Sequence, residues 1–197
     1  MNKTDLKNDF LKELDGYFMQ LSYLQDLDMV DEDILRHNKE MERAPKFTLI
    51  IECALMNDYM TTFMRLYDKG KNKNTKTIKN LIKKTYCNIH LFPNSKHDCI
   101  KKKLSEFENT INTDTTISNA IKVLEMRRDK ILAHNDSKYF GIKQKNDTSH
   151  LPMHQLWELF SFTEKVVLYI YSLLSDNTTK PLRYKPQYNK DLSNLFK

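Results

Sequence analysis

The chain has 197 residues, which is long enough for one domain that buries about 70% of its unfolded surface and short for two. Only 3 glycines and 5 prolines are present, fewer than a protein with frequent tight turns requires. This scarcity argues against β-barrels, β-sandwiches, glycine-rich dinucleotide sites and P-loops. Because 40% of the residues are hydrophobic and 29% are charged, the chain can form a core, and we expect a helical globular protein.

Net charge and cysteine content bear on partners and compartment. The 32 basic and 26 acidic residues leave a charge of +6, which favours a polyanionic partner without identifying one. Cys53, Cys87 and Cys99 are too few for a disulfide framework and indicate a reducing compartment. No apolar run reaches membrane-spanning length, and the first residues lack the apolar stretch of a signal peptide. We therefore expect a cytoplasmic protein with no membrane partner.

Apolar residues at three- and four-residue steps predict four main helices. The second begins at Pro45, is apolar on more than one face and is expected to be the central core helix. The four segments are residues 4–25, 45–68, 113–134 and 152–174. Weaker periodicity predicts short helices at 31–42, 78–86 and 99–111, with a loop at 87–98.

This order of elements predicts an all-α bundle of four main helices with additional short helices. We see no internal repeat. Residues 1–175 are expected to form a single helical domain, and residues 176–197, which contain Pro181 and Pro186, an extended C-terminal tail.

The third main helix carries an arginine among apolar residues. Arg128 falls on the helical face formed by Ile117, Ile121, Leu124 and Ile131. An unpaired guanidinium is costly to bury, so Arg128 requires a carboxylate, a phosphate or a water-filled groove opposite it. Arg127 and His134 lie on the flank of the same face. The end of this helix therefore presents two arginines and a histidine.

These residue types suit the cleavage of RNA without a metal. Imidazole can move a proton from a ribose 2′-hydroxyl near neutral pH, and guanidinium can stabilise the negative phosphoryl group. A second acid or base is still required, and a symmetric homodimer supplies it if two copies of His134 and Arg128 face one groove. The spacing alone favours a structural role, in which Arg128 pairs with Glu52 or Asp58 and His134 caps its own helix.

One string resembles the signature of the HEPN superfamily, namely RRDKILAHND at residues 127–136. That signature is an arginine, then usually Asn, Asp or His, and a histidine at the helix end after four to six intervening residues. Arg128, Asp129 and His134 match it, with five residues between the arginine and the histidine. The resemblance implies that Arg128 and His134 are catalytic and that Asp129 orients one of them. Its accessory residues would be Arg127, Asn135 and Asp136.

More loosely, residues 44–175 are similar to the abortive-infection, AbiU-like branch of this superfamily. Members of this kind are all-helical and usually dimeric, and many are metal-independent endoribonucleases of toxin–antitoxin or antiphage systems. The resemblance implies an RNA-cleaving homodimer that needs no cofactor and has an antitoxin or nucleotidyltransferase partner. Some branches carry a tyrosine two residues after the histidine, which a nucleotidyltransferase partner modifies. This chain has Asp136 at that position, so the resemblance does not extend to the modified tyrosine. Other members are inactive, so a non-catalytic module that binds RNA, a nucleotide or a partner is the alternative.

Three other groups of residues have a chemical interpretation. Cys87, His90, His97 and Cys99 are potential zinc ligands, but their spacing matches no zinc module and incidental loop residues are preferred. A series of lysines could attract RNA phosphates but is more typical of a solvated helix face. It comprises Lys69, Lys71, Lys73, Lys76, Lys79, Lys83, Lys84 and Lys101 to Lys103. Trp157, Tyr169 and Tyr171 are expected in the core or a dimer interface rather than stacked on bases.

Overall fold

The computed structural model describes residues 2–68, 75–128 and 152–175, and within these ranges the fold is entirely helical, without a strand. The all-α prediction is thereby confirmed. The described α-helices are α1 (Lys3–Arg36), α2 (Asn38–Met41), α3 (Pro45–Tyr67), α4 (Ile78–Cys87), α5 (His97–Thr113), α6 (Thr115–Met126) and α7 (Met153–Ser175). None of them is long and apolar enough to cross a membrane.

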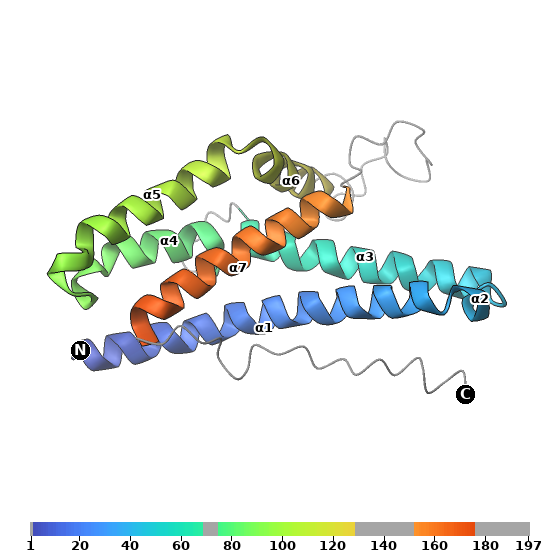
Figure 1. Ribbon diagram of the computed structural model, residues 1–197, viewed down its shortest axis with the longest axis horizontal. Helices are drawn as coiled ribbons and strands as arrows, with labels where there is room; N and C mark the ends of the chain where they lie inside the picture. Colours follow the sequence, from blue (N-terminus) through green and yellow to red (C-terminus); the bar gives the residue numbers. More distant parts are fainter. Residues whose placement is uncertain (1, 69–74, 129–151, 176–197) are drawn as a thin grey trace.

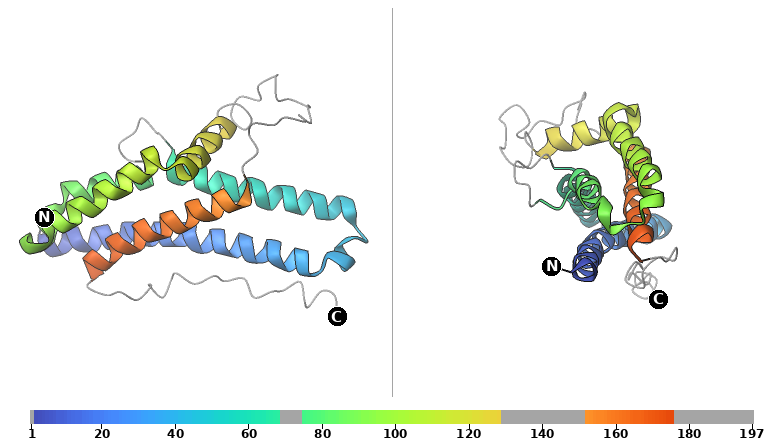
Figure 2. Two further views of the ribbon diagram at one scale, coloured as in Figure 1. Left: turned by 45° about the horizontal axis from the view of Figure 1, so that its top comes forward. Right: turned by 90° about the vertical axis from the view of Figure 1, so that its left-hand side faces the viewer.

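Two long helices, α1 and α3, lie side by side along the molecule and are joined at one end by α2 (Figure 1). The remaining helices gather toward the other end, against the first part of α1 and the last part of α3 (Figures 1 and 2). There α7 packs against α1, α4 and α6, and α6 also contacts α3 and α5. The core is therefore concentrated at one end of the α1–α3 pair.

The buried side chains follow this division. The largest of those that are fully buried are Phe10, Phe18, Phe63, Leu14, Leu21, Leu24, Ile78, Leu81, Ile82, Ile100, Leu104 and Leu124. In α1 this set lies between residues 10 and 24, and in α3 the buried residues begin at Tyr59. The first part of α1 and the last part of α3, which lie against α4–α7, are thus the most buried. The other ends of these two helices have fewer helices around them.

Helix α1 is longer than its sequence pattern predicts. It starts with a capping box in which the Asn2 side chain accepts from the Thr4 amide at 2.9 Å and the Asn2 amide donates to Asp5 at 3.3 Å. The predicted end near residue 25 is wrong, because Leu27 and Ile34 are buried and the helix continues to Arg36. A separate helix over 31–42 is also wrong, since only the four residues of α2 follow.

Helix α3 has the predicted limits, but the apolar side chains of its first half are not buried. Its first part is largely exposed, with Phe47 at 60%, Leu49 at 60% and Ile50 at 66% of their full exposure. The expectation of a central core helix therefore holds for the second half of α3, from Tyr59 onward, and not for its first half. The apolar residues of its first part lack the helices that cover its last part.

The remaining described elements follow the predictions closely, and the predicted end of the third main helix near residue 134 lies outside the described residues. The connection between α4 and α5 contains two single turns of 3₁₀ helix, Ile89–Leu91 and Asn94–Lys96, and α5 begins two residues earlier than expected. Tyr169 and Tyr171 pack against Phe107 and Phe18, with ring centroids 5.6 and 5.3 Å apart. Trp157 is not a core residue, because it is 52% exposed and donates through Nε1 to Asp28 at 3.2 Å. The predicted tail, residues 176–197, lies outside the described residues.

Candidate active site at the end of helix α6

Helix α6 is held by a cap at its start and by apolar packing along one face. The Asp114 carboxylate accepts from the backbone amides of Thr116 and Ile117, both at 2.9 Å. Ile117, Ile121 and Leu124 are buried, as the apolar face of the sequence predicts. This packing against α3, α5 and α7 sets the direction in which the end of α6 points.

Arg127 and Arg128 continue α6 in a wider, π-type turn. The Arg128 guanidinium forms an ion pair through Nη1 with the Asp68 carboxylate. The Arg128 side chain is 33% exposed, and that of Asp68 is 36% exposed. Arg128 therefore lies at the edge of the apolar face, beside a carboxylate and within reach of solvent.

Asp68 is the C-cap residue of α3, directly after the last helical residue. The C-terminal end of a helix carries a partial negative charge, so a carboxylate there is unfavourable and a cation is favourable. Arg128 faces both the carboxylate and this helix end. The preceding residue, Tyr67, is buried and its hydroxyl lies 2.7 Å from that of Thr163 on α7. Burial raises the pKa of Tyr67 well above its ordinary value, so the phenol stays protonated and fixes the end of α3.

Arg127 points to another part of α3. Its Nη1 donates to the sulfur of Met60 at 3.0 Å. Between α3 and α6 lies a narrow hollow with no room for a water molecule, lined by Met64, Tyr67, Asp68, Ile121, Leu124, Glu125 and Arg128. The two arginines thus flank the packed α3–α6 contact.

The acidic partner of Arg128 differs from both predicted candidates. Asp58 instead accepts a hydrogen bond from Tyr23, and Glu52 lines a hollow with Asp31 on the α1 side of α3. No local pattern pointed to Asp68, because it is a single acid at a helix end, 60 residues from Arg128. The sequence argument that Arg128 needs a carboxylate, a phosphate or a groove was sound, but the choice of carboxylate was wrong.

The rest of the predicted site falls outside the described residues. This holds for Asp129, His134, Asn135 and Asp136, and also for Ile131 of the apolar face. The structure therefore places Arg127 and Arg128 of the predicted set. These two arginines follow the last residue of α6, Met126, and the predicted helix end near His134 lies outside the described residues.

The Cys/His loop does not assemble a metal site. In residues 2–68, 75–128 and 152–175, no three His, Cys, Asp or Glu side chains come together as ligands of one ion. Cys87 and Cys99 are exposed, and Nε2 of His97 lies 3.0 Å from the Phe92 carbonyl oxygen. The described geometry of this loop therefore gives no support to the zinc alternative.

The described lysines contact protein groups as well as solvent. Lys76 and Lys84 approach the Glu13 carboxylate of α1 at 2.8 and 2.5 Å, and Lys79 donates to Asn112 at 3.3 Å. Lys84 also lies over the Phe10 ring, 4.7 Å from its centroid. These three lysines hold α4 and the residues before it against α1 and α5, so they have a structural role. Lys69, Lys71 and Lys73 of the series lie outside the described residues.

The fold and site together define a class of protein. The described residues form an all-helical bundle, which is the fold that the resemblance to the HEPN superfamily predicts. Residues 9–195 match the family model described as AbiU2, and the chain therefore belongs to the HEPN AbiU2 family, which is associated with abortive infection. The match extends well beyond the residues of the sequence resemblance. We found no match among curated proteins or solved structures.

Proposed function

We propose that this protein is a metal-independent endoribonuclease of a toxin or antiphage abortive-infection system. In this proposal His134 transfers a proton at the ribose 2′-hydroxyl, and Arg128 stabilises the charge that develops on the phosphoryl group. Asp129 orients one of the two, and Arg127, Asn135 and Asp136 are accessory. Membership of the HEPN AbiU2 family and the string at residues 127–136 support this assignment.

The observation that carries the proposal is the setting of Arg128. A guanidinium that is one-third exposed at a helix end can turn from a carboxylate to a phosphate without being desolvated again. A fully buried arginine could not make that exchange. Asp68 would then hold the guanidinium in place until RNA arrives.

We also propose that the protein is a homodimer, because one histidine per chain supplies only one acid or base. Exposed apolar side chains on the first half of α3 support self-association, since Phe47, Leu49 and Ile50 are each at least 60% exposed. Ile50 and Asp68 are 18 positions apart on one helix, about 27 Å at 1.5 Å per residue. A contact through these residues therefore supports self-association but does not bring two copies of Arg128 and His134 to one groove, which requires a second contact at the other end of α3. An antitoxin is a further candidate partner for the exposed residues.

The catalytic proposal is tested on a structured and a single-stranded RNA in the presence of EDTA. We expect the wild type to cleave and both His134→Ala and Arg128→Ala to lose at least about a hundredfold in rate. Arg36→Ala is the matched control, because Arg36 is an exposed arginine paired with Glu32 on α1. Cleavage that persists in both site variants would overturn the assignment, and equal loss in the control would show a general charge effect.

The Arg128–Asp68 ion pair also favours a second function. A guanidinium already neutralised by a carboxylate is the arrangement of a structural residue, and the protein would then be a non-catalytic module that binds RNA, a nucleotide or a partner protein. Salt-sensitive RNA binding without any cleavage by the wild type would support this alternative.

A further inference from the structure

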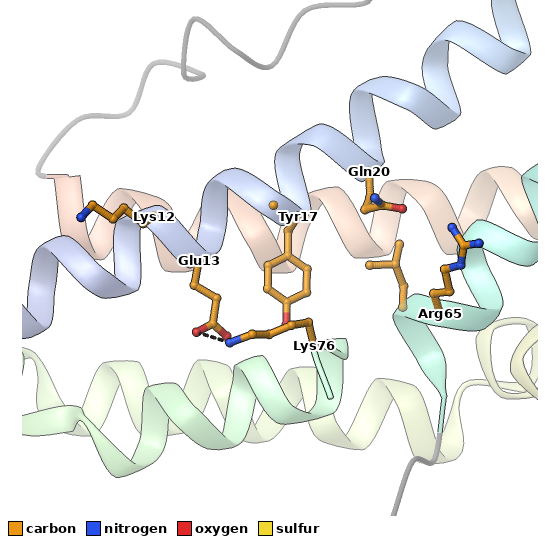
Figure 3. A pocket seen from close by; sticks show the side chains of 8 residues that line it. Lys12, Glu13, Tyr17, Gln20, Arg65 and Lys76 are labelled. Carbon is orange, nitrogen blue, oxygen red and sulfur yellow. Dashed lines mark ion pairs between the residues drawn. The ribbon is translucent and has the colours of Figure 1, made fainter. Parts of the chain in front are cut away.

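A second pocket lies on the opposite side of α3, between α1, the end of α3 and the residues before α4 (Figure 3). Its volume is about 430 Å³, within the range of about 300–1,000 Å³ found for small-molecule sites. It is lined by Lys12, Glu13, Gly16, Tyr17, Gln20, Arg65, Leu66 and Lys76. None of these residues belongs to the candidate active site.

One wall of the pocket is a row of residues on α1. Lys12, Gly16 and Gln20 are four positions apart and therefore share one face of the helix. Gly16 leaves a gap between two long polar side chains, and a β-carbon built there has no atom within 4 Å. Neither packing nor a turn requires this glycine, although glycine inside a helix costs about 0.5–1 kcal/mol relative to alanine. The space it leaves belongs to the pocket.

The floor of the pocket is apolar and firmly held. Tyr17 and Leu66 are both nearly fully buried, and the Tyr17 hydroxyl donates to the Thr77 carbonyl at 3.2 Å. Burial and the nearby Glu13 charge raise the pKa of Tyr17, so this phenol remains a neutral donor. An aromatic ring or an aliphatic group can therefore pack against Tyr17 and Leu66 without a rearrangement of the protein.

The charged groups of the rim leave a net charge of +2. Lys12, Arg65 and Lys76 contribute three positive charges, and Glu13 contributes one negative charge. Glu13 has a second cationic partner, Lys84, at 2.5 Å, so it stays neutralised if Lys76 turns toward a ligand. Lys76 is 66% exposed and free to make that turn, and Lys12 and Arg65 stand at either end of the pocket in Figure 3.

We propose that this pocket binds a small phosphate monoester whose organic part lies over Gly16 against Tyr17 and Leu66. A phosphate monoester carries a charge of about −1.5 to −2 at pH 7, which matches the rim. Arg65 holds the phosphate by charge-assisted hydrogen bonds together with Lys76 once Lys76 turns from Glu13, and Lys12 adds to the positive charge from the other end of the pocket. This inference is independent of RNA cleavage, because no residue of the 127–136 string takes part.

The test is isothermal titration calorimetry of the wild type with 4-methylumbelliferyl phosphate. The matched probe is 4-methylumbelliferyl sulfate, which has the same ring and one negative charge, and inorganic phosphate and 4-methylumbelliferone probe each half alone. We expect saturable binding of the phosphate ester, at least about tenfold weaker binding of the sulfate, and weaker binding still of either half. No saturable binding of the phosphate ester, or equal binding of the sulfate, would overturn the proposal.

Two pairs of variants locate the binding site. Gly16→Trp fills the gap and is expected to abolish binding, whereas Gly16→Ala adds one carbon and is expected to retain it. Arg65→Gln is expected to weaken binding about tenfold, and Arg36→Gln, at the far end of α1, is expected to leave it unchanged. Thermal unfolding of each variant shows that it is folded. Binding that survives Gly16→Trp in folded protein would contradict the assignment.

Discussion

Arg128, at the end of α6, forms an ion pair with Asp68, the C-cap residue of α3. The pair joins two helices whose apolar faces meet in the core below it, through Met64 and Tyr67 on α3 and Ile121 and Leu124 on α6. It keeps the cation at the surface while the residues beside it are buried. Each proposed role of Arg128 depends on how readily this pair opens.

Opening the pair by removing the carboxylate is expected to strengthen RNA binding. In Asp68→Asn the Arg128 guanidinium no longer has to leave this carboxylate to reach a phosphate, so the affinity for RNA should rise by up to about fivefold, the equivalent of an exposed ion pair of about 1 kcal/mol. The gain should shrink as the salt concentration rises, because salt screens the ion pair. Fluorescence anisotropy at several salt concentrations measures the dissociation constant. Glu32→Gln, which releases Arg36 far from the site, is the control, and a change of the same size there would remove the argument for Asp68.

The same pair is expected to contribute little to stability. Both side chains are about one-third exposed, and ion pairs of that kind contribute about 0.2–1 kcal/mol. A double-mutant cycle of Arg128→Gln and Asp68→Asn in urea unfolding measures the coupling. A coupling of several kcal/mol would mean that Arg128 is a structural residue and would favour the non-catalytic alternative.

Glu13 is expected to make stability depend on pH in the acid range. Burial by itself would raise the pKa of this carboxyl, but hydrogen bonds from Lys76 and Lys84, together with their charges, hold it below its ordinary value of 4.5. A lowered pKa in the folded state stabilises the protein above the unfolded value, and this stabilisation is lost as the pH falls through the folded value. At pH 7 Glu13→Gln should cost about 1.5–3 kcal/mol in free energy of unfolding, and the difference from wild type should shrink below pH 4.5. A difference that stays constant from pH 7 to pH 3 would show that the charge of Glu13 is not responsible.

Gly16→Ala is expected to raise the free energy of unfolding by about 0.5–1 kcal/mol, since it removes a glycine from a helix interior. The new methyl group meets no atom within 4 Å, so no steric cost opposes the gain. Urea unfolding monitored by circular dichroism measures the difference. Destabilisation would mean that the backbone at residue 16 needs glycine for a conformational reason, and the open space could then no longer be assigned to a ligand.

Self-association through the first half of α3 is expected to be lost when a negative charge is introduced there. Phe47→Glu and Ile50→Glu place a carboxylate among exposed apolar side chains and should convert a dimer to a monomer in sedimentation experiments.

Cys53 lies on the same half of α3, whereas the other two thiols lie on α4 and α5. All three are exposed in the single chain, so a dimer formed here should slow iodoacetamide labelling of Cys53 but not of Cys87 or Cys99. Equal labelling at all three positions in a dimer would place the interface elsewhere.

Local sequence properties determined the helical class and most helix limits. Apolar residues at helical steps, caps at Thr77 and Asp114, and prolines at the start of two helices act within one or two turns, so they are visible without the fold. The string at residues 127–136 pointed to the HEPN superfamily for the same reason, since its residues are contiguous. The periodicity did not show where α1 ends, because acids at 26, 28 and 31 interrupt a pattern that buried Leu27 and Ile34 sustain.

Only the tertiary structure decided which faces are covered and which distant residues meet. An apolar helical face looks the same in sequence whether or not another helix lies against it, which is why the exposed half of α3 was predicted to be core. The partner of Arg128 is 60 residues away, and the pocket over Gly16 draws on three separate segments. Such pairings depend on how whole helices pack, and side-chain periodicity records only the direction in which each residue points along its own helix.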